Sequence, residues 1–204
     1  MRHLPNMLSL SRLIATVLVF IFVLINQPWA FLVATLLFFL ASVTDFLDGY
    51  LARRLKVTSS LGVFLDLTAD KVLVSAILIA LVQIGLVPAW IVFIIITREF
   101  LVTGLRSMAA ARGKVIPAGM WGKQKTFITL VAMGALLLAK GLGAHQLSLF
   151  PPMLLFNSQT VNVSEILLLA ADFLLILATI WTAFSGIEYM ISALPLFQNE
   201  QETK

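Results

Sequence analysis

The sequence predicts an all-α, polytopic membrane protein with six transmembrane helices and a short interfacial N-terminal segment. Of its 204 residues, 60% are hydrophobic and only 12% are charged, whereas about 25% of a soluble domain is charged. The mean hydropathy is +1.02. The apolar residues fall into six stretches, each of roughly the 20 residues that a helix needs to cross a bilayer. We expect one domain over residues 1–204.

The N-terminal part is predicted to form a polar lead-in over residues 1–6 and a first spanning helix from Met7 to Ile25. No small-residue cleavage site follows this stretch, so a signal peptide is not favoured. Arg12 lies well inside it and is expected to face protein or the headgroup layer, because an isolated charge in lipid is costly. A turn at residues 26–29 precedes the next helix.

The remaining five helices are separated by short turns and one longer connector. Gly85 and Pro88 mark one turn, and the connector at 143–164 contains Pro151-Pro152, residues that interrupt helices. The five predicted helices cover residues 29–51, 61–86, 89–111, 126–142 and 165–194.

Lysine and arginine gather at alternate connections. Basic residues occur at the N-terminus, between the second and third helices and between the fourth and fifth: Arg2, Arg53, Arg54, Lys56, Arg112, Lys114, Lys123 and Lys125. The positive-inside rule therefore predicts an inner (cytoplasmic) membrane protein with both termini and the 2–3 hairpin on the cytoplasmic side. The net charge of +4 is explained by these cations at the ends of membrane helices. Because the chain has no soluble basic domain, we do not expect it to bind nucleic acid.

Two predicted helical faces each carry a pair of aspartates. One follows an i, i+3, i+4, i+7 spacing: Asp45, Asp48, Gly49 and Ala52. The next follows i, i+4, i+8: Gly62, Asp66 and Asp70. Such spacings place side chains on one face of a helix.

Four carboxylates on two helices joined by a tight hairpin predict a metal site. The alternative is that they form ion pairs with Arg53, Arg54 or Lys71, but four acids exceed what pairing requires. The chain has no cysteine and two distant histidines, so oxygen ligands and Mg2+ or Mn2+ are expected. Two ions about 4 Å apart would suit four carboxylates and a pyrophosphate.

The same residues resemble the signature of the CDP-alcohol phosphotransferase family, D-x2-D-G-x2-A-R-x8-G-x3-D-x3-D, and all eight specified positions are filled. The resemblance implies an integral membrane enzyme that transfers a substituted phosphoryl group from a CDP-alcohol to a hydroxyl. It implies Asp45, Asp48 and Asp66 as the main metal ligands. Asp70 would approach the second ion and act as general base.

The resemblance also implies a binding surface for the CDP-lipid. It is formed by small residues that admit the nucleotide and by donors to its phosphates: Gly49, Ala52, Arg53, Ser59 and Gly62. Arginine suits this role because it grips phosphate through two parallel donors. Gly49 and Gly62 have an alternative interpretation as helix-packing positions.

A second informative stretch runs from Thr97 to Thr126. Arg98 lies within an apolar run and should face the bundle interior, and Glu99 and Arg106 are seven residues apart and nearly aligned along the helix. We predict a pocket for a second phosphate, that of the acceptor, formed by four cations: Arg98, Arg106, Lys123 and Lys125. We expect buried roles for the first three, with Lys125 open between a buried and a solvated position. Arg112 and Lys114 are assigned to a solvated loop.

Several looser segments resemble phosphatidylglycerophosphate synthases within the family. They are R-E-F-x3-G-L-R, G-K-x-K-T, the opening P-N-M-L-S-L-S-R, and a C-terminal set consisting of Trp181, Ser185, Gly186 and Tyr189. This resemblance implies CDP-diacylglycerol and sn-glycerol 3-phosphate as substrates, phosphatidylglycerophosphate and CMP as products, and a homodimer in the bilayer. The connector at 143–164 departs from the pattern.

Three alternatives stay open at this point. The acceptor could be inositol phosphate or another group, although the cationic set favours a phosphorylated one. A magnesium-dependent intramembrane prenyltransferase also uses aspartate pairs, but in two distant motifs. A cation transporter would place aspartates near the bilayer middle in broken helices, whereas here they cluster toward one end.

Overall fold

The computed structural model describes residues 4–55, 60–111, 113, 120–144 and 162–193. Within these ranges the side chains of residues 4–9, 45–55, 60–67, 120–123 and 193 are not described. The described residues form six α-helices and no strand, which confirms the all-α prediction. The helices are α1 (Leu4–Ile25), α2 (Pro28–Leu55), α3 (Ser60–Gln83), α4 (Ala89–Ala111), α5 (Met120–Gly141) and α6 (Val163–Ala193).

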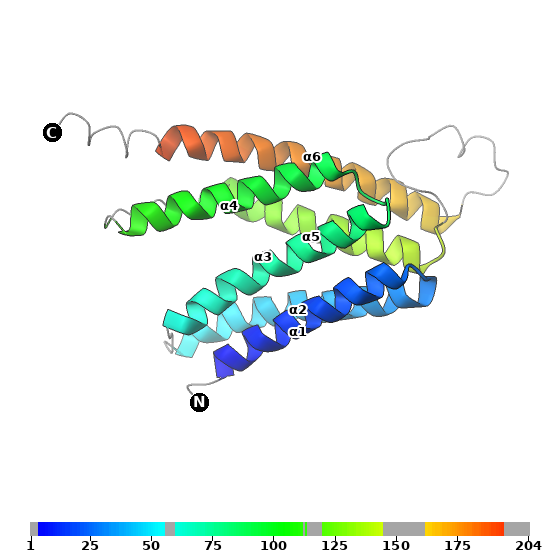
Figure 1. Cartoon of the computed structure of the whole chain (residues 1–204), viewed down its shortest axis with the longest axis horizontal. Coiled ribbons are helices and arrows are strands. Elements are labelled where there is room, and N and C mark those ends of the chain that lie inside the picture. The colour runs from blue at the N-terminus through cyan, green and yellow to red at the C-terminus, as the bar shows by residue number, and fades with distance from the viewer. Residues whose placement is uncertain (1–3, 56–59, 112, 114–119, 145–161, 194–204) are drawn as a thin grey trace.

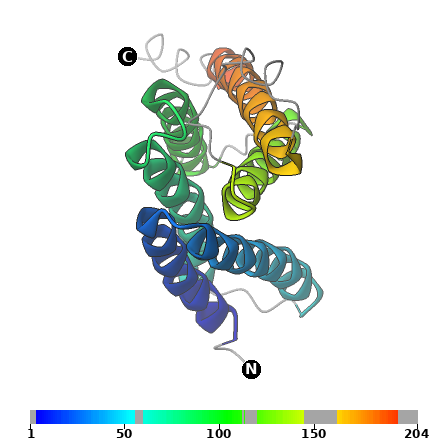
Figure 2. The same ribbon diagram turned by 90° about the vertical axis from the view of Figure 1, so that its right-hand side faces the viewer.

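The six helices form a ring in the order α1, α2, α5, α6, α4, α3. Figure 2 shows this arrangement nearly end on, with α1, α2 and α3 in the lower half and α4, α5 and α6 in the upper half. Helix α1 packs against both α2 and α3, and α6 packs against both α4 and α5. The two halves meet where α2 contacts α5 and where α3 contacts α4.

Successive helices run in opposite directions, so alternate connections lie at the same end of the bundle. Helices α1, α3 and α5 begin, and α2, α4 and α6 end, toward the left of Figure 1. We call this the motif end, because α2 finishes there and α3 starts there with the aspartate signature. Helix α1 begins at this end, and the two connections that the sequence marks as basic, α2 to α3 and α4 to α5, join their helices here.

The turn between α3 and α4 shows why α3 ends at Gln83 rather than at the predicted Leu86. Gly85 has a φ of 75°, and its N–H donates to the carbonyl of Val82 at 2.9 Å. The N–H of Leu86 donates to the carbonyl of Leu81, also at 2.9 Å. This pair of bonds is the Schellman arrangement, in which glycine takes the left-handed conformation and satisfies the last carbonyls of the helix.

Small residues allow α5 to pack closely against α2. A Cβ added at Gly134 would lie 3.3 Å from the Phe38 ring, and one added at Gly141 would lie 2.7 Å from Leu32 Cδ2 and 3.1 Å from the Leu32 backbone nitrogen. Close approach over glycine is a feature of helix packing in membranes. The core between the helices is apolar, and its largest fully buried side chains include Phe31, Ile77, Leu81, Met133, Leu136 and Leu175.

The outer surface is also apolar, while several polar side chains are buried. Phe39, Phe93, Phe127 and Phe184 are each more than 60% exposed. The buried polar residues include Arg12, Thr16, Lys125, Thr129, Asp172, Thr179, Thr182 and Ser185. Such extended apolar exposure is unusual for a soluble monomer and indicates contact with a membrane or a partner.

By length and composition, one helix in the described part of the chain can cross a membrane, over Val163–Ser192. Leu10–Ile25 and Pro28–Thr44 are shorter apolar helical stretches. Six spans are therefore not confirmed as such. In α4, Arg98 and Glu99 interrupt the apolar run near the middle of the helix.

Two predicted boundaries differ in other ways. Residues 4–6 of the predicted polar lead-in belong to α1, which is continuous from Leu4, and residues 1–3 lie outside the described residues. Helix α5 begins at Met120 instead of residue 126, so Lys123 and Lys125 lie within its first two turns. Most of the connector at 143–164 lies outside the described residues.

Candidate functional site

The aspartate signature lies on the parts of α2 and α3 that are nearest the motif end. Asp45 is 10 residues before Leu55, the end of α2, and Asp70 is 10 residues after Ser60, the start of α3. At 1.5 Å per residue, each therefore lies about 15 Å along its helix from the hairpin. Asp48 and Asp66 are correspondingly level, at 7 and 6 residues from the two helix ends. The backbone thus places the four aspartates in two matched tiers.

Asp70 is the member of this set whose side chain the structure describes. Its carboxylate Oδ1 accepts a hydrogen bond from Arg12 Nη1 at 3.4 Å, an ion pair between α3 and α1. The Arg12 side chain is 1% exposed and the Asp70 side chain is 54% exposed. Arg12 thus faces protein, as its position predicts, and it anchors a carboxylate that is open to solvent.

The donor set fits a divalent cation. Carboxylate oxygens are the ligands that Mg2+ and Mn2+ prefer, and Asp70 offers one that is accessible despite its buried neighbour Ala69. No cluster of three or more His, Cys, Asp or Glu residues occurs among the described side chains. The side chains of Asp45, Asp48 and Asp66 are outside that description.

The predicted CDP-lipid surface is placed only through its backbone. Gly49, Ala52 and Arg53 lie on α2, and Gly62 lies on the first turn of α3. Their surroundings and side chains are not described, and Ser59 lies outside the described residues.

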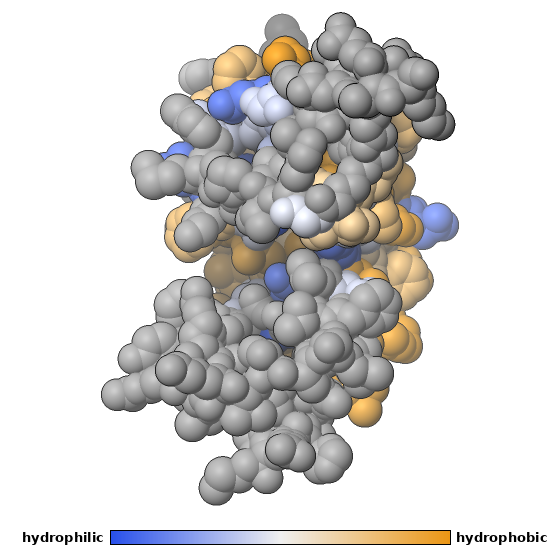
Figure 3. Space-filling model, turned by 90° about the vertical axis from the view of Figure 1, so that its left-hand side faces the viewer, coloured by the Kyte–Doolittle hydropathy of each residue, from blue (hydrophilic) through white to orange (hydrophobic). Residues whose placement is uncertain are grey.

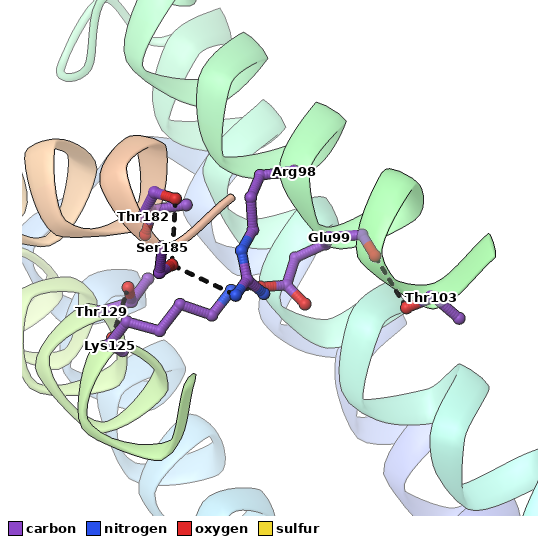
Figure 4. A network of polar contacts seen from close by, with 7 residues as sticks. All are labelled: Arg98, Glu99, Thr103, Lys125, Thr129, Thr182 and Ser185. Carbon is purple, nitrogen blue, oxygen red and sulfur yellow. Dashed lines mark hydrogen bonds and ion pairs between the residues drawn. The ribbon is translucent and has the colours of Figure 1, made fainter. Parts of the chain in front are cut away.

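A polar network joins α4, α5 and α6 in the other half of the bundle (Figure 4). Glu99 Oε1 accepts a hydrogen bond from Lys125 Nζ and lies 3.6 Å from Arg98 Nη1. Arg98 Nη2 donates to Ser185 Oγ at 3.2 Å, and Ser185 Oγ donates to the carbonyl of Thr182 at 3.1 Å. The network therefore has two cations and one carboxylate, an excess of one positive charge.

The side chains of the two cations in this network are well buried. The Arg98 side chain is 11% exposed and the Lys125 side chain is 4% exposed. Burial of Arg98 confirms the prediction from its apolar surroundings, and Lys125, which the sequence left open, is buried as well. Buried positive charge in excess of its counter-charge favours an anion nearby.

Arg106 differs from the prediction. It was expected to be buried, but it is exposed in this structure, because it lies 8 residues beyond Arg98, about 12 Å farther along α4 toward the motif end. The side chain of Lys123 is outside the described side chains.

Helix α6 shapes the space around Arg98. A Cβ added at the buried Gly186 would lie 2.8 Å from Arg98 Cγ, 3.7 Å from its Cβ and 3.9 Å from its Cδ. The first distance is shorter than real side chains adopt, so glycine is what lets the stem of Arg98 cross α6 at this point. The residue before this glycine, Ser185, accepts a hydrogen bond from the guanidinium group of Arg98.

Sequence reasoning missed several partners in both clusters. It considered Arg53, Arg54 and Lys71 as partners of the aspartates, whereas Arg12 of α1 contacts Asp70. It aligned Glu99 with Arg106, whereas Glu99 pairs with Lys125. It also overlooked Asp172, which is 3% exposed within the apolar helix α6. A charge inside an apolar helix was the signal that could have found it.

The two clusters lie in different halves of one bundle and face the same end. Figure 3 views the motif end, where hydrophilic surface is visible in the recess between the upper and lower halves and hydrophobic surface lies along the flank. Carboxylates in one half suit cations, and excess positive charge in the other suits an anion.

Comparison with known proteins gives a consistent result. The model of a family described as CDP-alcohol phosphatidyltransferase matches residues 2–184. A Bacillus subtilis relative named CDP-diacylglycerol--glycerol-3-phosphate 3-phosphatidyltransferase is 46% identical over 151 residues, covering 68% of this chain and 78% of the relative. A Rickettsia bellii relative of the same name is 38% identical over 162 residues, covering 79% and 90%. A Mycobacterium tuberculosis relative named probable phosphatidylglycerophosphate synthase is 36% identical over 196 residues, covering 94% and 82%.

Proposed function

This chain belongs to the CDP-alcohol phosphatidyltransferase family, and on that premise we propose that it transfers the phosphatidyl group of CDP-diacylglycerol to sn-glycerol 3-phosphate. The products are phosphatidylglycerophosphate and CMP. The observation that supports a phosphorylated acceptor is the buried pair Arg98 and Lys125. Helices α4 and α5 bring these two cations together with a single carboxylate, that of Glu99, between them. The relatives named for glycerol 3-phosphate support the same choice.

We propose that all six helices span the membrane and that residues 1–204 form one domain. The apolar outer surface and buried polar residues of the bundle support this, and helices of 22 to 31 residues are long enough to cross about 30 Å of hydrocarbon. The basic connections at the motif end favour a cytoplasmic orientation for that end and both termini. From the resemblance to the family we also propose a homodimer in the inner membrane.

The donor side of the reaction rests on the aspartate signature. Asp45, Asp48, Asp66 and Asp70 would hold two divalent ions, Mg2+ or Mn2+, which when bound supply positive charge to the pyrophosphate and its leaving group. Gly49, Ala52 and Gly62 would let the nucleotide approach the helices, and Arg53 and Ser59 would donate to its phosphates. Arg12 would keep the Asp70 carboxylate oriented through their ion pair.

The acceptor side rests on the cationic cluster. Arg98 and Lys125, with Arg106 and Lys123 nearer the motif end, would hold the phosphate of glycerol 3-phosphate and orient its free hydroxyl toward Asp70. Asp70 takes the hydroxyl proton, the oxygen forms a bond to the lipid-side phosphorus, and the bond from that phosphorus to the CMP oxygen breaks. Positioning and electrostatic stabilisation carry most of the rate enhancement in such transfers.

The test is CMP release by the purified protein in detergent with CDP-diacylglycerol, Mg2+ or Mn2+, and one acceptor at a time. Release with glycerol 3-phosphate alone is the expected result. Release with inositol phosphate instead would keep the donor site and refute the acceptor. No release with any acceptor from folded protein would refute the reaction itself.

The acceptor pocket has its own test in Arg98→Ala. We expect the KM for glycerol 3-phosphate to rise at least tenfold, because a hydrogen bond to a charged group contributes about 1.5–3 kcal/mol. The KM for CDP-diacylglycerol should change little. An unchanged KM for glycerol 3-phosphate would remove Arg98 from the pocket.

A further inference from the structure

The hydroxyl of Tyr189 on α6 is a buried polar atom without a partner. It has essentially no solvent exposure, and within the part of the chain that the structure describes nothing forms a hydrogen bond with it. The residue as a whole is only half-buried, so the ring reaches the surface while its polar tip points inward. Buried hydroxyl groups in native proteins nearly always have a partner, and an exception calls for one that is absent from the structure.

The surroundings of this hydroxyl indicate what the absent partner is. Tyr189 lies one helical turn after Ser185, whose hydroxyl accepts a hydrogen bond from Arg98 Nη2 at 3.2 Å. Arg98 Nε is likewise buried and lacks a hydrogen-bond partner among the described residues. Two donors without acceptors therefore adjoin a network with excess positive charge, a combination that a single anion would satisfy.

The neighbouring polar groups do not supply that acceptor in this structure. Ser185 lies one turn before Tyr189 on α6, and its hydroxyl already accepts from Arg98 and donates to the carbonyl of Thr182. The Glu99 carboxylate is engaged by Lys125 and Arg98 Nη1. Gly186 offers no polar side chain, and it leaves room for the stem of Arg98 beside α6. The Tyr189 hydroxyl and Arg98 Nε thus remain buried donors without an acceptor among the described residues.

We propose that Tyr189 is a further binding residue of the acceptor site, whose hydroxyl donates a hydrogen bond to the phosphomonoester of the acceptor. The proposal deepens the function proposed above and rests on it. A phosphomonoester matches the set because it offers several acceptor oxygens and two negative charges to one hydroxyl and two guanidinium groups. Ser185 and Gly186 act as positioning residues, since they touch Arg98.

The first test is Tyr189→Phe, which removes the hydroxyl and keeps the ring. In the CMP-release assay the KM for glycerol 3-phosphate should rise about tenfold, the loss expected for one hydrogen bond to a charged group. The KM for CDP-diacylglycerol should stay within twofold. Inorganic phosphate should inhibit the wild type competitively against glycerol 3-phosphate, and its inhibition constant should rise by the same factor in the variant.

The matched control is Thr179→Val, which also removes a buried hydroxyl from α6. Thr179 Oγ1 donates to the carbonyl of Leu175 within its own helix at 2.7 Å and has no role in the proposed site. Both KM values and the phosphate inhibition constant should match the wild type.

A binding measurement separates this proposal from the reaction itself. Inorganic phosphate alone, without CDP-lipid, should raise the thermal unfolding temperature of the detergent-purified wild type more than that of Tyr189→Phe. Equal phosphate protection and an unchanged KM in Tyr189→Phe would overturn the proposal while the wild-type reaction stands. A rise in both KM values in Tyr189→Phe, together with a lower unfolding temperature in the absence of phosphate, would also overturn the proposal. Tyr189 would then have a structural role. Failure of the wild type to use glycerol 3-phosphate would instead refute the proposed function.

Discussion

The ion pair between Glu99 and Lys125 predicts an asymmetric response to mutation. The Lys125 side chain is 4% exposed and the Glu99 side chain is 28% exposed. Glu99→Gln would leave the Lys125 ammonium buried beside Arg98, whose like charge opposes it. Lys125→Met would instead replace a buried cation by an apolar side chain of similar length, and Glu99 would keep Arg98 Nη1 at 3.6 Å.

The magnitudes follow from these distances and exposures. At an effective dielectric constant of 20, two unit charges at the Arg98–Glu99 distance interact by about 5 kcal/mol before desolvation. Breaking a buried pair while leaving one charge behind costs about 3–5 kcal/mol. Because Glu99 is partly exposed, we discount this to about 2–3 kcal/mol for Glu99→Gln. Lys125→Met should cost about 1 kcal/mol or less, since an apolar replacement of a buried ion is often neutral.

The assay is unfolding of the four proteins of a double-mutant cycle in one detergent, followed by tryptophan fluorescence. The double variant Glu99→Gln with Lys125→Met should lose less stability than the sum of the two single losses, because one of the two cations that Glu99 compensates is then gone. It should still be less stable than Lys125→Met alone, because Arg98 loses its contact with Glu99. Equal losses in the two single variants, adding in the double variant, would refute the reasoning that Lys125 is the charge left uncompensated. Lys125→Met should still have a raised KM for glycerol 3-phosphate, since its contribution to binding is separate from its contribution to folding.

Three further predictions test the donor site and the packing. Asp70→Asn should abolish CMP release while it retains much of the CDP-lipid binding, and substantial turnover would remove Asp70 as the general base. A chelator should likewise stop CMP release, and added Mg2+ or Mn2+ should restore it; activity that survives exhaustive chelation would refute the metal assignment. Gly141→Ala should lower stability by about 1–3 kcal/mol, because its Cβ would approach the Leu32 backbone nitrogen at 3.1 Å. Gly104→Ala is the control, since nothing lies within 4 Å of its Cβ and alanine favours a helix over glycine by up to about 1 kcal/mol, so an equal loss in both variants would contradict the packing argument.

The helices and the faces that carry the aspartates could be predicted from the sequence, because both depend on residues close to one another in the chain. Apolar runs define the helices, and spacings of three and four residues define a face of α2 and a face of α3. The boundary errors arose where local signals are ambiguous. Lys123 and Lys125 read as loop residues from their charge, but they occupy the first turns of α5, where only packing against α4 and α6 decides whether a lysine is buried.

The pairings across helices could not be predicted in the same way. Arg12 and Asp70 are 58 residues apart, and Arg98 and Ser185 are 87 apart. No spacing rule connects such positions, because their contact depends on the ring order of the helices. Arg12 was recognisable as a charge that must be buried, but its partner was not.

The ring order also bears on how the proposed reaction is assembled. The aspartates lie on α2 and α3, whereas Arg98, Lys125 and Tyr189 lie on α4, α5 and α6. In the proposed reaction the donor and acceptor groups are therefore held by different halves of the bundle, and their separation depends on the contacts of α2 with α5 and of α3 with α4. Since small misplacements of reacting groups lower rates strongly, the close packing of Gly134 against Phe38 should matter for turnover as well as for folding. A larger residue at Gly134 should lower kcat more than it raises either KM, because each half would still bind its own substrate.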